Sequence, residues 1–445
     1  MCVLVEAIVT ERVLLYCQHV LGIGHLVRSA EIVKELSRDS QILFISGGEK
    51  PAGFRFPENE NIDILQLPPL KTDPDFSNLQ VCGSWRSMDE TKTLRRHLLL
   101  QAFVEFQPDV VVTEMFPFGR KQFRFELLPL LEHVRQQSPQ TMVVSSVRDI
   151  LVTRKDQEEY EQRVCDLVNA FYDLILVHGD KNFQKFDETF SRVNDLRCPV
   201  TYTGYVVQQK DPNTTEAGRL QLSEQGQPAI VASIGSGQYL TGLTLLETVL
   251  RAAQLLQSRI PHEFHVFAGP LMPEEAYSRL QTLADESRNV RLSRYTSDLA
   301  AVLKRADVSV SMGGYNTMMD VLSSRVRALV YPVTSNGDQE QCLRAERLAE
   351  AGVIDVIRTE ELTPNELARK IERALSKTPT PLTVNCQGAA NSVLILKKYL
   401  AAHRERPFDT VKSGSGRKKE TSDRGKFLTQ TQEEREAPNR EISCG

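Results

Sequence analysis

A histidine follows two closely spaced glycines near the start of the chain. Residues 22–25 read GIGH, after an apolar run at 13–17 and before a helical pattern that carries Arg28. Glycines let a ligand approach the backbone, and a histidine can take a proton from a hydroxyl near neutral pH. We therefore interpret His25 as a candidate catalytic base and Gly22, Gly24 and Arg28 as candidate acceptor-side or phosphate ligands. A structural histidine in a turn is the alternative.

Two loops in the second half of the chain also follow apolar runs and lead into helical patterns. From Val308 to Arg347 the pattern is strand, glycine turn, helix, strand, polar loop and helix. Ligands of open α/β sheets bind at the carboxyl ends of strands, where helix N-termini attract anions. The pattern predicts an anion or small-ligand site, with glycines that only ease a turn as the alternative. Its candidate residues are Gly313, Gly314, Asn316 and Thr317.

A second glycine loop and an acid are candidates for binding the same ligand. Gly235, Ser236 and Gly237 follow an apolar run, and their N–H groups could hold a diphosphate. Asp320 lies one to two helical turns after the glycine pair at 313–314, where a carboxylate can bind a ribose diol. A plain tight turn and a solvated helix acid are the respective alternatives.

The polar loop before the helix near residue 339 holds three further candidates. Asp338, Gln339 and Gln341 could bind sugar hydroxyls, although Asp338 could instead cap the helix. In the first half, Glu114 and Arg120 flank the segment MFPFG after a predicted strand, and Arg148 follows another. Glu114 is a second candidate base, and both arginines are candidate acceptor-side or phosphate ligands. For each, an ordinary ion pair is the alternative.

Apolar runs and amphipathic segments indicate the elements that position these residues. Strands are expected at 13–17, 41–46, 63–67, 110–113, 142–147, 174–178 and 201–205, and again at 229–233, 264–267, 290–292, 308–310 and 328–333. Helices are expected at 26–36, 89–106, 243–256, 298–305, 363–375 and 389–403, after the glycine pair, and from about 339. The helix at 389–403 is a candidate to pack back on the first domain. The long loop at 68–88, which holds Trp85, is a candidate functional loop.

This alternation predicts the α/β class, with two Rossmann-like β/α/β domains facing each other across a cleft. The first domain is expected at 1–207 and the second at 229–403, joined by a polar linker at 208–228. Residues 404–445 combine mixed charge with few apolar groups, so we expect them to be disordered. A cleft between domains is the default ligand site.

Composition narrows the class of protein. The chain has 445 residues, a net charge of -4 and 41% hydrophobic residues, which is typical of a soluble globular protein and argues against a general nucleic-acid binder. Its eight cysteines show no metal-ligand spacing, which favours reduced thiols in the cytoplasm. We expect neither a signal peptide nor a membrane span. Amphipathic stretches leave open peripheral contact with a membrane.

The motifs together resemble a known enzyme family. GIGHLVR, GSG and SMGGYNTMMDVL…YPVTSNGDQEQCLRAERL look like two-domain glycosyltransferases of the GT-B fold, related to family 28 and to the enzyme that adds N-acetylglucosamine to the lipid-linked peptidoglycan precursor. FPFGR and SVRDIL further resemble an uncharacterised group of predicted glycosyltransferases. The resemblance covers about residues 12–400.

The resemblance implies roles for matching residues. His25 matches a proposed base or acceptor-positioning group, and Gly235 to Gly237 match the loop near the donor diphosphate. Asp320 stands where the family has a glutamate on the ribose. Gln339 and Gln341 bracket a glutamine pair that reads the donor sugar, and Glu340 interrupts that pair.

The expected function is transfer of a sugar from a nucleoside-diphosphate donor, UDP-linked by family precedent, to an unknown hydroxyl on a small molecule, lipid or glycan. The resemblance implies an inverting reaction without a metal or other cofactor. A nucleotide-sugar hydrolase has a similar glycine–histidine opening and is the first alternative; a 2-epimerase is a weaker one. A non-catalytic scaffold that binds a nucleotide sugar is the alternative from another class.

Overall fold

The computed structural model describes residues 10–20, 23–51, 54–72, 78–83, 87–208, 226–235, 239–270, 272–296, 298–334, 339–378, 380 and 384–405. The predicted site residues Gly22, Ser236, Gly237 and Asp338 lie outside these ranges, as does Trp85. Most of the predicted linker and nearly all of the predicted disordered tail also lie outside them. Both sheets of the fold belong to one compact unit of the chain.

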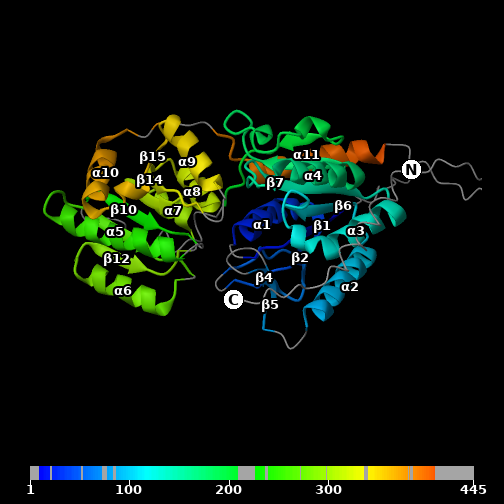
Figure 1. Cartoon of the computed structure of the whole chain (residues 1–445), viewed down its shortest axis with the longest axis horizontal. Coiled ribbons are helices and arrows are strands. Elements are labelled where there is room, and N and C mark those ends of the chain that lie inside the picture. The colour runs from blue at the N-terminus through cyan, green and yellow to red at the C-terminus, as the bar shows by residue number, and fades with distance from the viewer. Residues whose placement is uncertain are drawn as a thin grey trace, which may run out of the picture. The chain divides into compact units, whose positions relative to one another are not determined.

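The first half of the chain forms a seven-stranded parallel sheet (Figure 1). From edge to edge its strands are β3 (Ile62–Gln66), β2 (Ser40–Ser46), β1 (Glu11–Cys17), β6 (Val110–Glu114), β7 (Met142–Arg148), β8 (Leu174–His178) and β9 (Val200–Tyr202). The central strands are nearly continuous runs of buried apolar residues, because helices cover both faces of a parallel sheet. The seven predicted strands are confirmed, with ends that differ by a few residues.

Four helices connect these strands: α1 (Gly24–Leu36), α2 (Met88–Phe106), α3 (Arg124–Gln137) and α4 (Gln157–Phe171). Helix α2 begins with a capping box, in which Ser87 and Glu90 satisfy each other's backbone N–H groups. The predicted long loop at 68–88 contains an antiparallel pair, β4 (Leu70–Thr72) and β5 (Leu79–Val81). This pair was not predicted, since three-residue strands are too short for a clear alternation of apolar and polar residues.

The second half forms a six-stranded parallel sheet in the order β12 (Val290–Ser293), β11 (Glu263–Phe267), β10 (Ala229–Ser233), β13 (Val308–Met312), β14 (Arg327–Tyr331) and β15 (Ile354–Val356). Its helices are α5 (Tyr239–Gln257), α6 (Glu274–Asp285), α7 (Leu299–Leu303), α8 (Tyr315–Ser324), α9 (Glu340–Glu350) and α10 (Pro364–Ser376). The five predicted strands are present. Helix α6 and strand β15 are additions, and the apolar spacing of Ala276, Leu280 and Ala284 was a signal for α6. The fold is thus two Rossmann-like domains, as predicted.

The last helix, α11 (Gly388–Arg404), returns to the first sheet, where Figure 1 shows it beside the helices of that sheet. Leu396 and Leu400 are buried in the same core cluster as Val13 and Leu15 of β1. Packing of this helix on the first domain was anticipated from the sequence. Its core contacts therefore lie with the first sheet, although its residues follow those of the second.

The structure also bears on membrane-spanning helices and on the state of the cysteines. Within the described residues, no helix is both long and apolar enough to span a bilayer. The six cysteines in this part of the chain are free thiols, at positions 17, 82, 165, 198, 342 and 386.

Candidate active site

Each sheet has a point at which its strand order reverses. In the first sheet the chain runs from β1 outward to β3 and then returns to β6 on the other side of β1. In the second sheet the chain runs from β10 outward to β12 and then returns to β13 on the other side of β10. Ligands of open α/β sheets bind at the carboxyl ends of such neighbouring strands. His25 and Glu114 lie at the first of these points, and Gly235 and Gly314 lie at the second.

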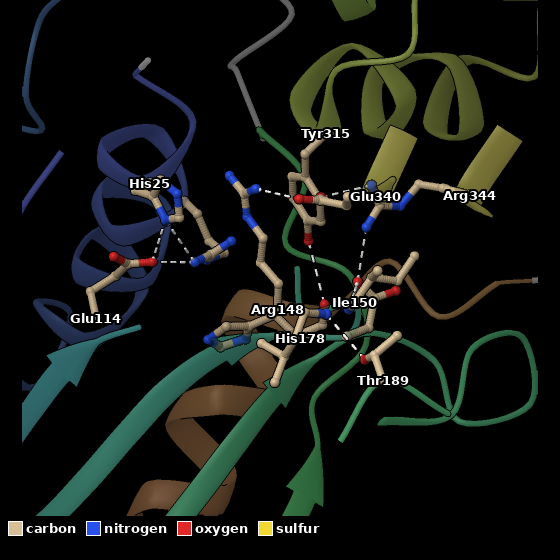
Figure 2. Close-up of polar contacts among 12 residues, drawn as sticks. His25, Glu114, Arg148, Ile150, His178, Thr189, Tyr315, Glu340 and Arg344 are labelled. Atoms are coloured by element: carbon tan, nitrogen blue, oxygen red, sulfur yellow. Dashed lines mark hydrogen bonds and ion pairs between the residues drawn. The ribbon is translucent and has the colours of Figure 1, made fainter. Parts of the chain in front are cut away.

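His25 lies in the first turn of α1, where its imidazole meets two charged side chains (Figure 2). Its Nδ1 is 2.6 Å from Oε1 of Glu114, and the same oxygen accepts a hydrogen bond from Arg28. The side chains of Glu114 and Arg28 are fully buried, whereas that of His25 keeps 16% of its exposure. A carboxylate beside Nδ1 favours the tautomer protonated there, which leaves the lone pair of Nε2 available.

Burial and neighbouring charges keep Glu114 ionised and His25 neutral. Burial raises the pKa of Glu114, but His25 and Arg28 together lower it by more. The pKa of Glu114 therefore lies below its ordinary value. Burial and then the charge of Arg148 lower the pKa of His25 to about 3. Of the two candidate bases, His25 is therefore the one that is uncharged and partly exposed, and Glu114 is placed to orient it.

A tight turn after Glu114 brings Arg120 back toward the same group. Met115 and Arg120 have positive φ values of 62° and 59°. Hydroxyls of Thr113 and Ser145 donate to the carbonyl of Phe116 at 3.0 and 2.9 Å, which holds the turn against the sheet. Nε of Arg120 is buried and has no hydrogen-bond partner in the described part of the chain.

The loops of the second sheet meet at the N-terminus of α8. Gly235 has a φ of +68°, and a Cβ there would lie 3.1 Å from Oγ1 of Thr317. Gly314 is the N-cap of α8 and supplies no capping side chain, so the first N–H groups of the helix are left for a ligand. A Cβ on Gly24 would lie 3.6 Å from the side-chain amide of Asn316. Residues predicted from two distant motifs are therefore neighbours.

A cavity of about 260 Å³ lies between these loops. The predicted site residues along its wall are Gly24, Arg148, Gly235, Gly314, Asn316, Thr317, Asp320 and Gln341. Residues that were not predicted complete the wall, among them Ile23, Val27, Phe54, Phe267, Gly269, Pro270, Arg294, Tyr295 and Thr296. Several of these follow β11 and β12, so the same strand-end rule could have identified them. Burial raises the pKa of Tyr295, and the nearby charge of Asp320 adds to this shift.

The predicted site residues near the start of α9 take different positions in the structure. Gln341 lines the cavity, and its Oε1 accepts a hydrogen bond from the N–H of Val333 at 3.1 Å. Gln339 is instead the N-cap residue of α9, without a side-chain cap hydrogen bond. Gly313 lies behind the cavity wall, where a Cβ would be 3.3 Å from both Gln341 and Pro332.

Tyr315 and its charged neighbours join the two domains (Figure 2). The guanidinium carbons of Arg28, Arg148 and Arg344 lie 5.7, 5.1 and 5.0 Å from the centre of its ring. Burial raises the pKa of Tyr315 to about 12, so its hydroxyl is uncharged and lies 3.5 Å from the carbonyl oxygen of His178. The sequence did not indicate this cluster, because cation–π partners share no spacing along the chain.

Comparison with known proteins agrees with this geometry. Residues 241–398 match the glycosyltransferase family 28 C-terminal domain. An uncharacterized glycosyltransferase of Methanosarcina acetivorans is 23% identical over 334 residues, which are 72% of this chain and 79% of that protein. The UDP-N-acetylglucosamine–N-acetylmuramyl-(pentapeptide) pyrophosphoryl-undecaprenol N-acetylglucosamine transferase of Glaesserella parasuis is 26% identical over 153 residues, 34% of this chain and 41% of that enzyme.

A solved structure shows the same fold. MurG of Acinetobacter baumannii superposes with a TM-score of 0.53 at 15% identity, over 87% of this chain and 99% of that one. The chain therefore has the GT-B fold, and its residues 241–398 match the glycosyltransferase family 28 C-terminal domain.

Proposed function

We propose that the protein transfers a sugar from UDP to a hydroxyl acceptor in one inverting displacement that needs no metal. The observation that supports this is a cavity that is lined from both sheets, near the point where the strand order of each sheet reverses. Gly24 lines it from the first sheet, and Gly235, Gly314 and Thr317 line it from the second. Acceptor-side and donor-side loops thus meet within reach of one bond-forming event.

The second sheet holds the donor in this proposal. The diphosphate lies at the N-terminus of α8, where the helix dipole and free N–H groups stabilise negative charge as the leaving group departs. Asp320 binds the ribose, and Gln341 faces the sugar. The nucleobase of the donor lies near Phe267 and Tyr295, which also line the cavity. The uridine assignment is supported by the donor named for the Glaesserella parasuis relative.

The first sheet supplies the acceptor side. Nε2 of His25 takes the proton of the acceptor hydroxyl, while Glu114 holds the imidazole and balances the charge that forms on it. The acceptor oxygen attacks the anomeric carbon, and the bond from that carbon to the diphosphate oxygen breaks. Attack opposite the leaving group inverts the anomeric configuration. Arg28 and Arg120 lie on this side of the reaction. Arg28 is buried against Glu114, whereas Arg120, whose Nε has no partner among the described residues, is suited to an acceptor phosphate or carboxylate.

A thermal-shift screen of nucleoside diphosphates and nucleotide sugars tests the donor half, because a ligand that binds only the folded state raises its melting temperature. We expect UDP and one UDP-sugar to give selective shifts. The absence of any shift would count against the proposal.

Turnover of the selected donor then separates the alternatives. We expect release of nucleoside diphosphate to depend on an added acceptor, to survive EDTA and to be lost in His25→Ala and Asp320→Ala. Equal release of free sugar without acceptor would instead indicate a hydrolase. Donor binding without turnover would indicate a scaffold.

A further inference from the structure

An ion pair connects the two domains, and its arginine lines the cavity. Arg148 is the last residue of β7 in the first sheet, and Glu340 is the first residue of α9 in the second. Nη1 of Arg148 lies 2.8 Å from Oε2 of Glu340, and their side chains are 15% and 9% exposed (Figure 2). This pair connects segments 192 positions apart in the sequence.

Arg148 also lines the cavity that holds the proposed phosphate site. Arg148 lines the cavity together with Gly314 and Asn316, which belong to the N-terminal end of α8. A Cβ built on Gly24 would lie 3.3 Å from Nη2 of Arg148. The guanidinium therefore lies between Glu340 and the place where a donor diphosphate would carry its charge. A guanidinium is planar and binds a phosphate with two parallel hydrogen bonds.

The two partners of this ion pair are held unequally. Glu340 also accepts a hydrogen bond from Nη1 of Arg344 at 2.9 Å, and Arg344 is held in turn by Asp149 at 3.0 Å. Among the described residues, Glu340 is the only carboxylate within ion-pair distance of Arg148. Loss of the Arg148 contact would therefore leave Glu340 paired with Arg344, whereas Arg148 would need another anion.

We propose that Arg148 binds the donor diphosphate and that Glu340 occupies Arg148 when no donor is present. This inference rests on the proposed nucleotide-sugar function and deepens it, because it assigns a phosphate ligand to the first domain and an internal competitor to the second. When the diphosphate enters, the guanidinium of Arg148 breaks its contact with Glu340 and binds a phosphate oxygen instead. Departure of the nucleoside diphosphate reverses this exchange, so Glu340 assists product release.

The exchange also bears on His25. After burial, the charge of Arg148 contributes most to the lowered pKa of His25. A diphosphate beside Arg148 would offset that charge and make His25 a stronger base only when the donor is bound.

Calorimetric titration of the full chain with UDP and with uridine tests the proposal. We expect Arg148→Met to weaken UDP binding at least about tenfold, because one charged hydrogen-bonded contact is lost. We expect Glu340→Gln to tighten UDP binding by about tenfold, because the competing anion is removed. Uridine carries no phosphate, so its affinity should equal that of wild type in both variants.

Glu188→Gln is the matched control. It removes the carboxylate of another ion pair between the two domains, that with Arg347, and leaves Arg148, Glu340 and Arg344 in place, so UDP affinity should stay at the wild-type value. A crystal structure of the wild-type chain with UDP gives a readout that needs no variant. We expect Arg148 within hydrogen-bond distance of a phosphate oxygen and separated from Glu340.

The outcomes distinguish the two levels of the proposal. If wild type binds neither UDP nor a UDP-sugar, both the proposed function and this inference fail. If wild type binds UDP but Arg148→Met and Glu340→Gln leave its affinity unchanged, only the inference fails. An Arg148–Glu340 pair that persists in the UDP complex would overturn the inference in the same way.

Discussion

Replacing Glu114 by glutamine separates the charge of this side chain from its geometry. Oε1 of Glu114 meets both His25 and Arg28, whereas Oε2 is buried without a hydrogen-bond partner among the described residues. Glutamine has nearly the same shape. It can keep its carbonyl oxygen toward His25 and place its amide group where Oε2 lies. The variant therefore removes a negative charge and leaves the imidazole oriented.

The expected rate loss follows from the charge that His25 gains in the reaction. A neighbouring carboxylate raises the pKa of a histidine by about 1–3 units. At about 1.36 kcal/mol per unit, the forming imidazolium loses about 1.4–4 kcal/mol of stabilisation in Glu114→Gln. We therefore expect kcat to fall about 10- to 1000-fold. The KM for the donor should not change, because the contacts of Glu114 are with His25 and Arg28 on the acceptor side.

A coupled assay of nucleoside diphosphate release measures this effect, with thermal unfolding as the check on folding. Glu132→Gln is the matched control, since Glu132 lies exposed on α3. A Glu114→Gln enzyme with the kcat of wild type would refute the assigned role of the carboxylate. A raised KM at unchanged kcat would instead place Glu114 in donor binding. His25→Asn at the wild-type rate would show that His25 is not the base.

Three further predictions concern the donor loop, acid stability and the core. Gly235→Ala should weaken UDP binding in calorimetry and lower the melting temperature, because a residue with a side chain costs about 1–3 kcal/mol at its positive φ. Burial holds the pKa of His178 well below 6.5. Burial raises the pKa of Glu340, but the charges of Arg148 and Arg344 outweigh it and lower this pKa to about 2. Both groups stabilise the fold above their unfolded pKa values and lose that contribution as pH falls, so the melting temperature should drop steadily between pH 6.5 and 2; a flat profile would contradict this. Arg95→Met should cost about 3–5 kcal/mol in urea unfolding, because it leaves Glu126 fully buried without its cation. The double variant with Glu126→Leu should recover most of that loss; if it does not, the buried pair is not the cause.

The periodicity of the sequence determined the fold, because parallel strands buried on both faces leave apolar runs that turns and amphipathic helices separate. The strand-end rule also placed the glycine loops correctly on their elements. Gly235 and Gly314 lie where a strand ends and a helix begins, and such turns carry local signals in glycine and polar residues. Short elements without a full period, such as β4, β5 and β15, gave too little signal to predict.

Only the tertiary structure decided which predicted residues act together. Glu114 and His25 are 89 positions apart, and their contact depends on β1 and β6 being neighbours in the sheet. Glu340 looked like an interruption in a donor-binding loop, but its carboxylate is held by Arg148 and Arg344. The contact with Arg344 follows from i,i+4 spacing within α9. No sequence spacing encodes the contact with Arg148, because it depends on the packing of the two domains. The chain thus specifies its chemical groups locally, whereas the fold determines their partners.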